Sequence, residues 1–156
     1  MKNAHSRIHL SFDLWTSLNY NAMLAIIGHW TADDYSLKTV LLSIKEIFGK
    51  HSGDIIGHAI FEVIQNFHIT RLLGFSTTDN ARNNDTALET ISTLLRDTYD
   101  IDYNVSEHRL RCLGHIINLV VKQLLFNSST LESDEMEYYG TLQKLHNIVH
   151  HVRTTP

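Results

Sequence analysis

The sequence predicts an α/β fold in which a mixed five-stranded sheet lies against flanking helices. Two observations lead to this prediction. The chain opens with three consecutive runs that have strand-like patterns, and segments of helical and strand-like spacing then alternate. Short links between the first three runs indicate an antiparallel meander, and the later alternation indicates two parallel strands with helices beside them.

The first predicted strand, residues 8–16, carries an aspartate near its middle. Every second residue from Ile8 is apolar, so Asp13 and Trp15 share the opposite face. Aspartate is uncommon in strands, and a carboxylate removed from water needs a compensating partner. The second strand, residues 22–30, is apolar on both faces, which predicts a sheet that is covered on both sides. Asp13 would then need a partner, whereas the alternative is a strand aspartate that faces water.

The remaining elements are predicted from periodicity and cap residues. Asn84 is placed to cap the second of the helices. The last helix before the polar stretch is apolar nearly all round, which predicts a buried helix. The expected elements are a strand at 37–44, a helix at 55–67, a strand at 71–78, a helix at 85–99, a strand at 109–113 and a helix at 116–126.

One domain over residues 1–126 is expected, followed by a linker and a further helix. The chain has 156 residues, of which 43% are apolar, as in an ordinary soluble domain. Residues 127–139 are polar and acidic, which predicts a linker, and residues 140–156 have helical spacing. No stretch reaches the ~18 apolar residues of a membrane span. The N-terminus lacks the apolar core of a secretory signal, so neither membrane insertion nor export is expected.

A second aspartate, Asp79, follows the strand predicted over residues 71–78, in the stretch STTDNARNN. In open α/β sheets, ligands usually bind at the carboxyl ends of the strands. Turn chemistry also explains the residue, because aspartates often cap helices. Asp13 and Asp79 have a joint explanation, in which two carboxylates from different strands hold Mg²⁺, a cation that prefers oxygen ligands and serves phosphodiester chemistry.

The stretch RCLGH, residues 111–115, places Cys112 and His115 in a C-x-x-H spacing. A structural zinc site takes four ligands, and Cys112 is the only cysteine, so no structural zinc is expected. A small thiol beside a histidine at a strand–helix junction is the simpler interpretation. His115 could also contact a phosphate or assist proton transfer.

The net charge of −4 argues against a domain that coats DNA by charge alone, because such domains are basic. This charge leaves open a site where metal ions supply the positive charge. Trp15 has two interpretations. Core packing is the ordinary role of a tryptophan, and stacking on an unpaired nucleobase is the alternative.

Five stretches, in this order, resemble the RNase H-like domain of hAT-family (hobo/Ac/Tam3) transposases. The resemblance runs from about Arg7 to Pro156 and implies an RNase H-like fold with the mixed sheet described above. The stretches are SFDLWTS at 11–17, HSGDII at 51–56, STTDNARNN at 76–84, RCLGHIINLVVK at 111–122 and KLHNIVHHVRTTP at 144–156.

The resemblance implies roles for the residues discussed above. Asp13 and Asp79 match the first two catalytic aspartates of the family, which lie on neighbouring strands and, with a later glutamate, bind two Mg²⁺ or Mn²⁺ ions. Trp15 matches an aromatic residue that is associated with a flipped base at the cut end. The implied site comprises Asp13, Asp79 and His115 as catalytic residues, Asp13 and Asp79 as metal ligands, and Trp15, Arg111 and Cys112 as DNA contacts.

The family's third acid follows a helical insertion that would begin about where this chain stops. We therefore expect a partial catalytic core that holds metal loosely and is inactive alone. DNA at transposon ends, a second copy of the chain and a full-length transposase are the expected partners, in the nucleus. Two alternatives remain, namely a non-catalytic, domesticated protein-interaction module and an active nuclease that uses a local acid such as Glu107 or Glu135.

Overall fold

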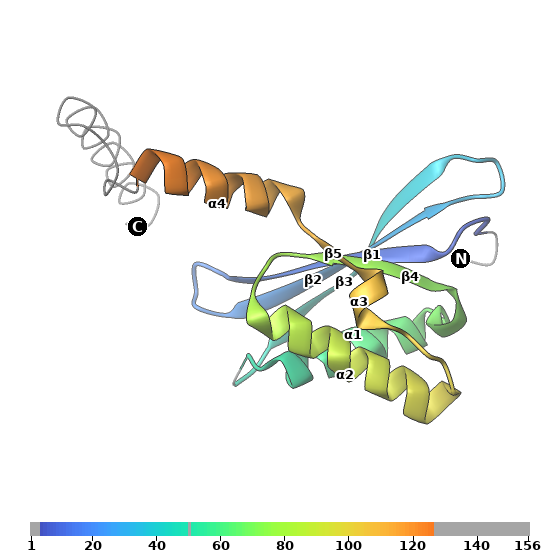
Figure 1. Ribbon diagram of the computed structural model, residues 1–156. Coiled ribbons are helices and arrows are strands. Elements are labelled where there is room, and N and C mark those ends of the chain that lie inside the picture. The colour runs from blue at the N-terminus through green and yellow to red at the C-terminus, as the bar shows by residue number, and fades with distance from the viewer. Residues whose placement is uncertain (1–3, 50, 127–156) are drawn as a thin grey trace. The chain divides into compact units, whose positions relative to one another are not determined.

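The structure, a computed structural model, describes residues 4–49 and 51–126 (Figure 1). The chain divides into two compact units, Met1–Cys112 and Leu113–Pro156, and each is described by itself. The predicted linker at 127–139 and the predicted helix at 140–156 lie outside the described residues, so both stay predictions.

A five-stranded sheet forms the first unit, with the strand order β3-β2-β1-β4-β5. The strands β1, β2 and β3 pair antiparallel, whereas β4 pairs parallel to both β1 and β5, so the predicted mixed sheet is confirmed. The strand β3 runs three residues further than expected, because its pairing with β2 continues to Ile47. The bounds are β1 Ile8–Thr16, β2 Ala22–Thr31, β3 Leu37–Ile47, β4 Leu73–Thr78 and β5 Arg109–Arg111.

The helices of the first unit begin earlier than their apolar periodicity suggests. Helix α2 begins at Arg82 with Ala81 as its N-cap residue, so Asn84 is not the cap that the sequence predicts. A short helix, α3, was not expected, and the side chain of Asn104 caps it by accepting from the backbone N–H of Ser106. The helices are α1 Gly53–Asn66, the 3₁₀ turn Thr70–Leu72, α2 Arg82–Tyr99 and α3 Val105–His108.

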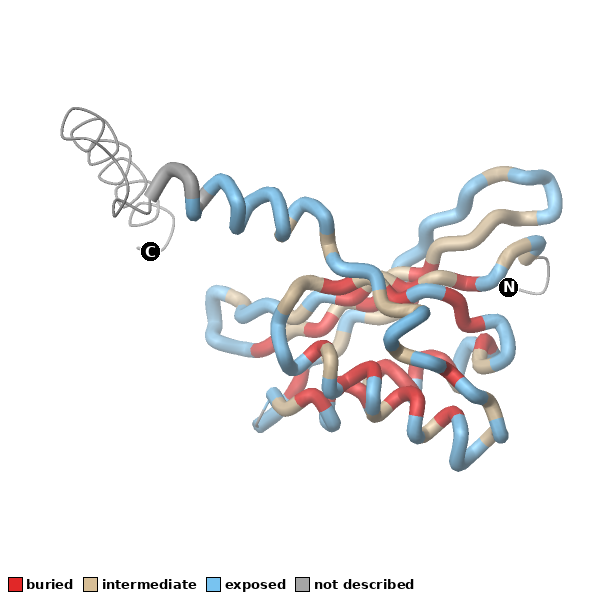
Figure 2. The backbone as a smooth tube through the Cα atoms, in the orientation of Figure 1, coloured by how far each residue is buried: buried red, intermediate tan, exposed pale blue. Residues whose placement is uncertain are grey.

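Helices α1 and α2 both cover the same face of the sheet (Figure 1). Buried residues gather between these helices and the strands (Figure 2). Alternation along β1 sends its apolar side chains into this layer, which leaves Asp13 and Trp15 on the other face. The core includes Leu10, Phe12, Leu24 and Ile26 from the sheet, Ile60 and Ile64 from α1, and Leu88 and Ile91 from α2.

The two helices approach each other closely at Gly57 of α1. A Cβ atom at this position would lie 2.7 Å from the backbone oxygen of Ala87 and 2.7 Å from the Cβ of Thr90. Real Cβ contacts are essentially never this short, so only glycine fits without displacement of α2. The close approach therefore fixes how closely α2 packs on α1.

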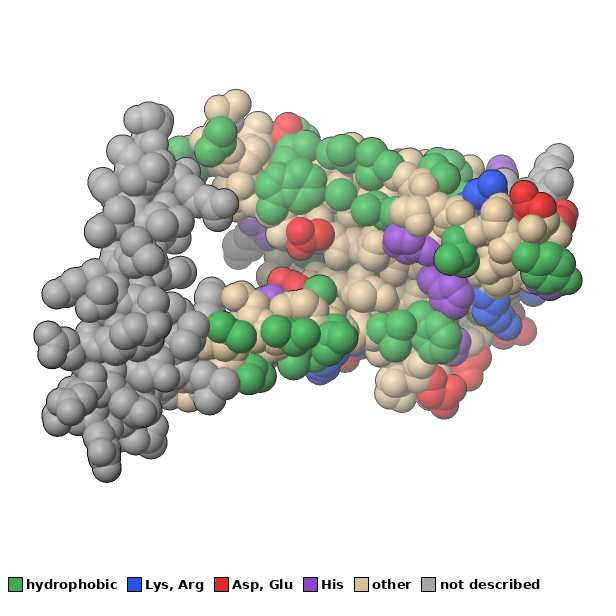
Figure 3. Space-filling view, turned by 90° about the horizontal axis from the view of Figure 1, so that it is seen from above, with side chains coloured by type: hydrophobic (Ala, Val, Ile, Leu, Met, Phe, Trp, Pro, Cys, Tyr) green, Lys and Arg blue, Asp and Glu red, His purple; other side chains and the backbone are tan. Residues whose placement is uncertain are grey.

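The second face of the sheet is open in the described part of the first unit, which corrects the expectation of a sheet covered on both sides. On this face of β2, Ala25 and Ile27 are only partly buried. In the edge strand β3, Leu41 and Ile44 are 53% and 52% exposed. Figure 3 shows this face, with hydrophobic side chains next to acidic side chains and histidines. The apolar run of β2 predicted a strand correctly but could not show whether a helix covers each face.

Helix α4, Leu113–Phe126, begins the second unit and confirms the helix that was predicted over residues 116–126. Within the second unit taken by itself, the described residues of α4 are exposed or partly exposed, and the expectation of a buried helix stays a prediction. Ile117 and Val120 are 53% and 52% exposed. Within the described residues, no helix has the length and apolar character that a membrane crossing requires.

Candidate functional site

The strand register brings Asp13 and Asp79 to neighbouring positions of the sheet. Strands β1 and β4 are parallel, with Ser11 opposite Thr77. Asp13 lies two residues beyond Ser11 in β1, and Asp79 lies two residues beyond Thr77 and directly follows β4, so a continued register would set the two aspartates opposite each other. Asp13 belongs to the open face, and Asp79 lies at the carboxyl end of β4, in the turn that leads to α2. Asp13 is exposed, so it does not need a partner for the reason that the sequence suggested.

Asp79 also shapes the turn between β4 and α2. Its Oδ1 accepts a hydrogen bond of 2.9 Å from the backbone N–H of Ala81 and one of 2.6 Å from Nδ2 of Asn84. These bonds are the turn and capping chemistry that the sequence offers as the alternative role of Asp79. They engage one carboxylate oxygen, and no hydrogen bond to Oδ2 is found among the described residues.

Arg109 in β5 holds this turn from the helix side of the sheet and was not anticipated from the sequence. Its side chain is 7% exposed and contacts the carboxylate of Asp85 in the first turn of α2. Its Nη2 also donates a hydrogen bond of 3.1 Å to the backbone oxygen of Asp79. Burial, followed by the neighbouring Arg111, lowers the pKa of Arg109, whereas Asp79 raises it. No local pattern marks Arg109, because its contacts depend on the pairing of β4 with β5.

Arg111 and Cys112 both lie at the carboxyl end of β5, beside the Asp79 turn. Arg111 is exposed and its Nη1 donates a hydrogen bond of 3.1 Å to Oδ1 of Asn80. Its register partner is the buried Thr78, so Arg111 belongs to the helix side of the sheet rather than to the face of Asp13. The backbone N–H of Cys112 donates to the oxygen of Thr78 at 2.9 Å, which continues the pairing of the strands.

Trp15 lies on the open face, two residues beyond Asp13, and its register partner in β2 is Met23. It is 40% exposed, so its indole is not a core side chain. This exposure leaves part of its aromatic surface accessible at the same end of the sheet as Asp79, while the rest of the ring is buried.

The other predicted site residues lie in different elements. His115 lies in the first turn of α4 and belongs to the second unit. Glu107 is exposed in α3, where its Oε1 accepts from Nδ2 of Asn104 at 2.8 Å. Glu135 lies outside the described residues. Over residues 4–49 and 51–126, no three His, Cys, Asp or Glu side chains are grouped as metal ligands.

A pair of histidines on the open face was also not anticipated. His9 and His29 are register partners on β1 and β2. The Nδ1 atom of His9 accepts a hydrogen bond of 3.0 Å from the backbone N–H of Phe75, where the register between β1 and β4 shifts. Nε2 of His29 is 2.8 Å from Oγ of Ser11. A neutral His9 therefore satisfies a backbone donor at the irregularity that precedes the two aspartates.

This arrangement predicts that acid destabilises the fold through His9. Burial, followed by the charge of His29, lowers the pKa of His9 below its usual value of 6.5. The unfolded chain then binds the proton more tightly, so the contribution to stability is present above pH 6.5 and is lost as the pH falls below it. Thermal unfolding between pH 8 and pH 5 measures the effect. His9→Gln keeps an acceptor for Phe75 and should flatten the pH dependence, whereas an unchanged slope in this variant would contradict the assignment.

Comparisons with known proteins agree with this fold. The family model of the ZBED1 RNase-like domain matches residues 11–106. The chain is 27% identical over 160 residues to a putative AC transposase and to a putative AC9 transposase of Zea mays, in matches that cover 100% of the chain and 18% of each relative. It is 26% identical over 120 residues to the putative transcriptional regulator tpeD of Talaromyces stipitatus, which covers 77% of the chain and 14% of that protein.

No solved structure gives a significant match to the chain. The chain spans less than a fifth of the length of these curated relatives. The matched residues run from β1 to α3 and contain both aspartates, the turn after β4 and helices α1 and α2. The chain therefore belongs to the family of ZBED1 RNase-like domains, and the resemblance to hAT-family transposases is confirmed.

Proposed function

We propose that this transposase-related domain binds a DNA strand at the carboxyl end of β1 and β4, where Asp13 and Asp79 hold a divalent cation. The observation that supports this proposal is the parallel register of β1 and β4, in which Ser11 pairs with Thr77, two residues before Asp13 and Asp79. The relatives named as transposases and as a transcriptional regulator support DNA as the partner and the nucleus as the location. Within DNA, we propose transposon ends as the specific partner.

The donor set fits Mg²⁺ or Mn²⁺. Both side chains supply hard oxygen ligands, Asp13 is exposed, and Oδ2 of Asp79 has no hydrogen bond among the described residues. When bound, such ions activate the attacking oxygen and stabilise the leaving oxygen of a phosphodiester. Arg109 and the Asp79 turn would keep one ligand in place, because the turn is tied to both β5 and α2.

The remaining site residues act on DNA in this proposal. Trp15 offers an exposed indole for stacking on an unpaired base, and Arg111 and Cys112 lie beside the Asp79 turn, where a strand would pass. His115 would contact a phosphate or move a proton. A third acid completes two-metal sites of this type, so we propose that these residues alone bind the ion weakly and that cleavage depends on association with a second copy or a full-length transposase.

Thermal unfolding with added Mn²⁺ tests the metal site. At a Mn²⁺ concentration about ten times Kd, binding stabilises the fold by ~1.4 kcal/mol, which raises Tm by roughly 4–6 °C for a domain of this size. Asp13→Asn and Asp79→Asn should each remove most of this rise. Asp33→Asn is the matched control, because Asp33 is an exposed carboxylate in the turn at the other end of β2. Equal shifts in all four proteins would reject the site.

The alternative is a non-catalytic interaction module, and the open face of the sheet favours it. Leu41 and Ile44 on this face are about half exposed, and exposed apolar patches often bind proteins. A chain without any Mn²⁺ shift that associates with itself in sedimentation would support this function over the first.

A further inference from the structure

Two hairpin turns of the first unit have the same geometry at opposite ends of β2. In the turn between β1 and β2, the backbone N–H of Ser17 donates to the oxygen of Asn21 at 2.8 Å, and that of Tyr20 donates to Ser17 at 2.9 Å. In the turn between β2 and β3, Ala32 donates to Ser36 at 2.9 Å and Tyr35 donates to Ala32 at 2.9 Å. The φ angles of Tyr20 and Tyr35 are 61° and 60°, in the left-handed region that favours glycine.

The structure explains the tyrosine of the second turn but not that of the first. The ring of Tyr35 packs on the ring of His5, with centroids 4.9 Å apart. The side chain of Tyr20 is 91% exposed and has no aromatic contact among the described residues. Leu18 in the same turn is 93% exposed. No aromatic contact among the described residues accounts for the bulky side chain of Tyr20 in this left-handed conformation.

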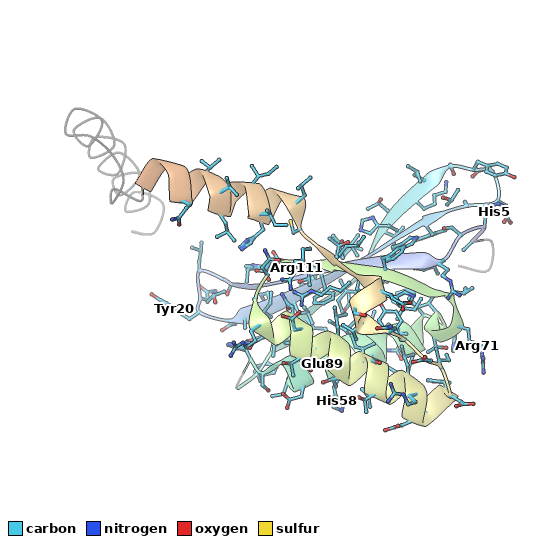
Figure 4. All side chains as sticks on the ribbon, viewed as in Figure 1. His5, Tyr20, His58, Arg71, Glu89 and Arg111 are labelled. Atoms are coloured by element: carbon cyan, nitrogen blue, oxygen red, sulfur yellow. The ribbon has the colours of Figure 1, made fainter. Side chains whose placement is uncertain are left out.

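The two turns also differ in charge and in what lies near them. The second turn contains two carboxylates, Asp33 and Asp34, whereas residues 14–31 contain no Asp, Glu, Lys or Arg. The first turn follows the carboxyl end of β1, which is the end of the sheet where Asp79 lies. Figure 4 shows Tyr20 and Arg111 toward this end and His5 toward the other.

We infer that Leu18 and Tyr20, in the turn between β1 and β2, form a stacking surface for unpaired bases of a DNA strand whose backbone passes the two aspartates. The inference rests on the proposed function and adds a second contact region to it. An uncharged turn does not repel phosphates, and an aromatic ring stacks on bases of any sequence. Asn19 and Asn21, which flank Tyr20, carry amides that donate and accept hydrogen bonds and suit the edges of unpaired bases.

Fluorescence anisotropy with a labelled single strand of roughly 12 nucleotides and with the matching duplex tests this surface. We expect the full chain to bind the single strand more tightly, with or without EDTA. Tyr20→Gly should weaken this binding by about 5- to 150-fold, the equivalent of ~1–3 kcal/mol per stacked base. Glycine is favoured at this φ, so Tm should not fall and the loss of binding cannot arise from unfolding.

Tyr20→Phe retains the ring and should bind as the wild type does. Tyr35→Gly is the matched control, because it makes the same change in the equivalent conformation at the other end of β2, and it should leave binding unchanged. The double variant Leu18→Asp with Asn19→Asp gives the first turn the carboxylates of the second and should abolish binding without a fall in Tm.

Three outcomes of the binding experiment would overturn the inference. They are a wild type that does not bind the single strand or prefers the duplex, a Tyr20→Gly variant that binds as the wild type does, and equal losses from Tyr20→Gly and Tyr35→Gly. Self-association that disappears in Tyr20→Gly would assign the turn to a protein partner and would also overturn it. Binding in EDTA is measured without a divalent cation, so it tests the turn independently of the metal site. If the wild type shows no Mn²⁺ shift in Tm but still binds the single strand through Tyr20, only the proposed metal ligands are rejected.

Discussion

The Gly57→Ala variant is expected to lose about 2 kcal/mol of unfolding free energy, although alanine is the better helix former. In an exposed helix the same change would stabilise by up to ~1 kcal/mol. At Gly57 the added Cβ would lie 2.7 Å from the backbone oxygen of Ala87, and a backbone atom of a packed helix cannot move aside cheaply. Overpacking of this kind costs roughly 1–3 kcal/mol. Urea unfolding and a Tm fall of about 8 °C would measure it.

His58→Ala provides the control, because His58 is the next residue of α1 and is exposed. Its stability should stay within about 0.5 kcal/mol of the wild type. A Gly57→Ala variant that is more stable than the wild type would show that α1 and α2 are not in close contact. Because α2 carries the residues that follow the Asp79 turn, the destabilised variant should also show a smaller Mn²⁺ shift.

The Arg109→Met variant is expected to lose about 2–3 kcal/mol. The Arg109 side chain is 7% exposed, and its removal leaves the Asp85 carboxylate and the backbone oxygen of Asp79 without their donor. Breaking a fully buried ion pair costs roughly 3–5 kcal/mol. Asp85 is 41% exposed, so solvent compensates part of this cost. Arg109→Lys keeps the charge but cannot contact both Asp85 and the backbone oxygen of Asp79. Its stability should therefore fall between those of Arg109→Met and the wild type.

A double-mutant cycle with Asp85→Asn separates the ion pair from the contact to Asp79. We expect a coupling energy of about 1–2 kcal/mol between Arg109 and Asp85. Arg109→Met should reduce the Mn²⁺ shift more than Asp85→Asn does, because only Arg109 bonds to the Asp79 backbone. Strict additivity of the two substitutions, with equal Mn²⁺ shifts, would contradict this assignment.

Periodicity was sufficient to predict the five strands and helices α1 and α2 of the first unit, but not the short helix α3. Alternation along β1 placed Asp13 and Trp15 on one face correctly, because a strand with a buried face has only one register that suits its apolar residues. A loop over residues 79–84 was also predicted, and it is shorter in the structure because α2 begins at Arg82. Positions within a strand, and the order of elements, can therefore be read from local sequence.

Features that depend on several elements could not be predicted. Asn84 looked like a cap because its residue type favours caps, but the Asp79 carboxylate organises the turn and lets α2 begin at Arg82. The open face was missed because an apolar run in β2 is the same whether a helix covers it or not. Arg109 gave no signal, since its partners at Asp79 and Asp85 are 30 and 24 residues away in sequence and meet it only through the parallel strands.

The shared metal site of Asp13 and Asp79 is measured most directly by paramagnetic broadening of backbone amide signals with trace Mn²⁺. We predict that signals of Leu14 in β1 and of Asn80 after β4 broaden together, and that Asp13→Asn and Asp79→Asn each remove the effect at both places. Broadening at only one of the two aspartates, or persistence of the effect at one aspartate when the other is replaced, would contradict a site that both carboxylates form.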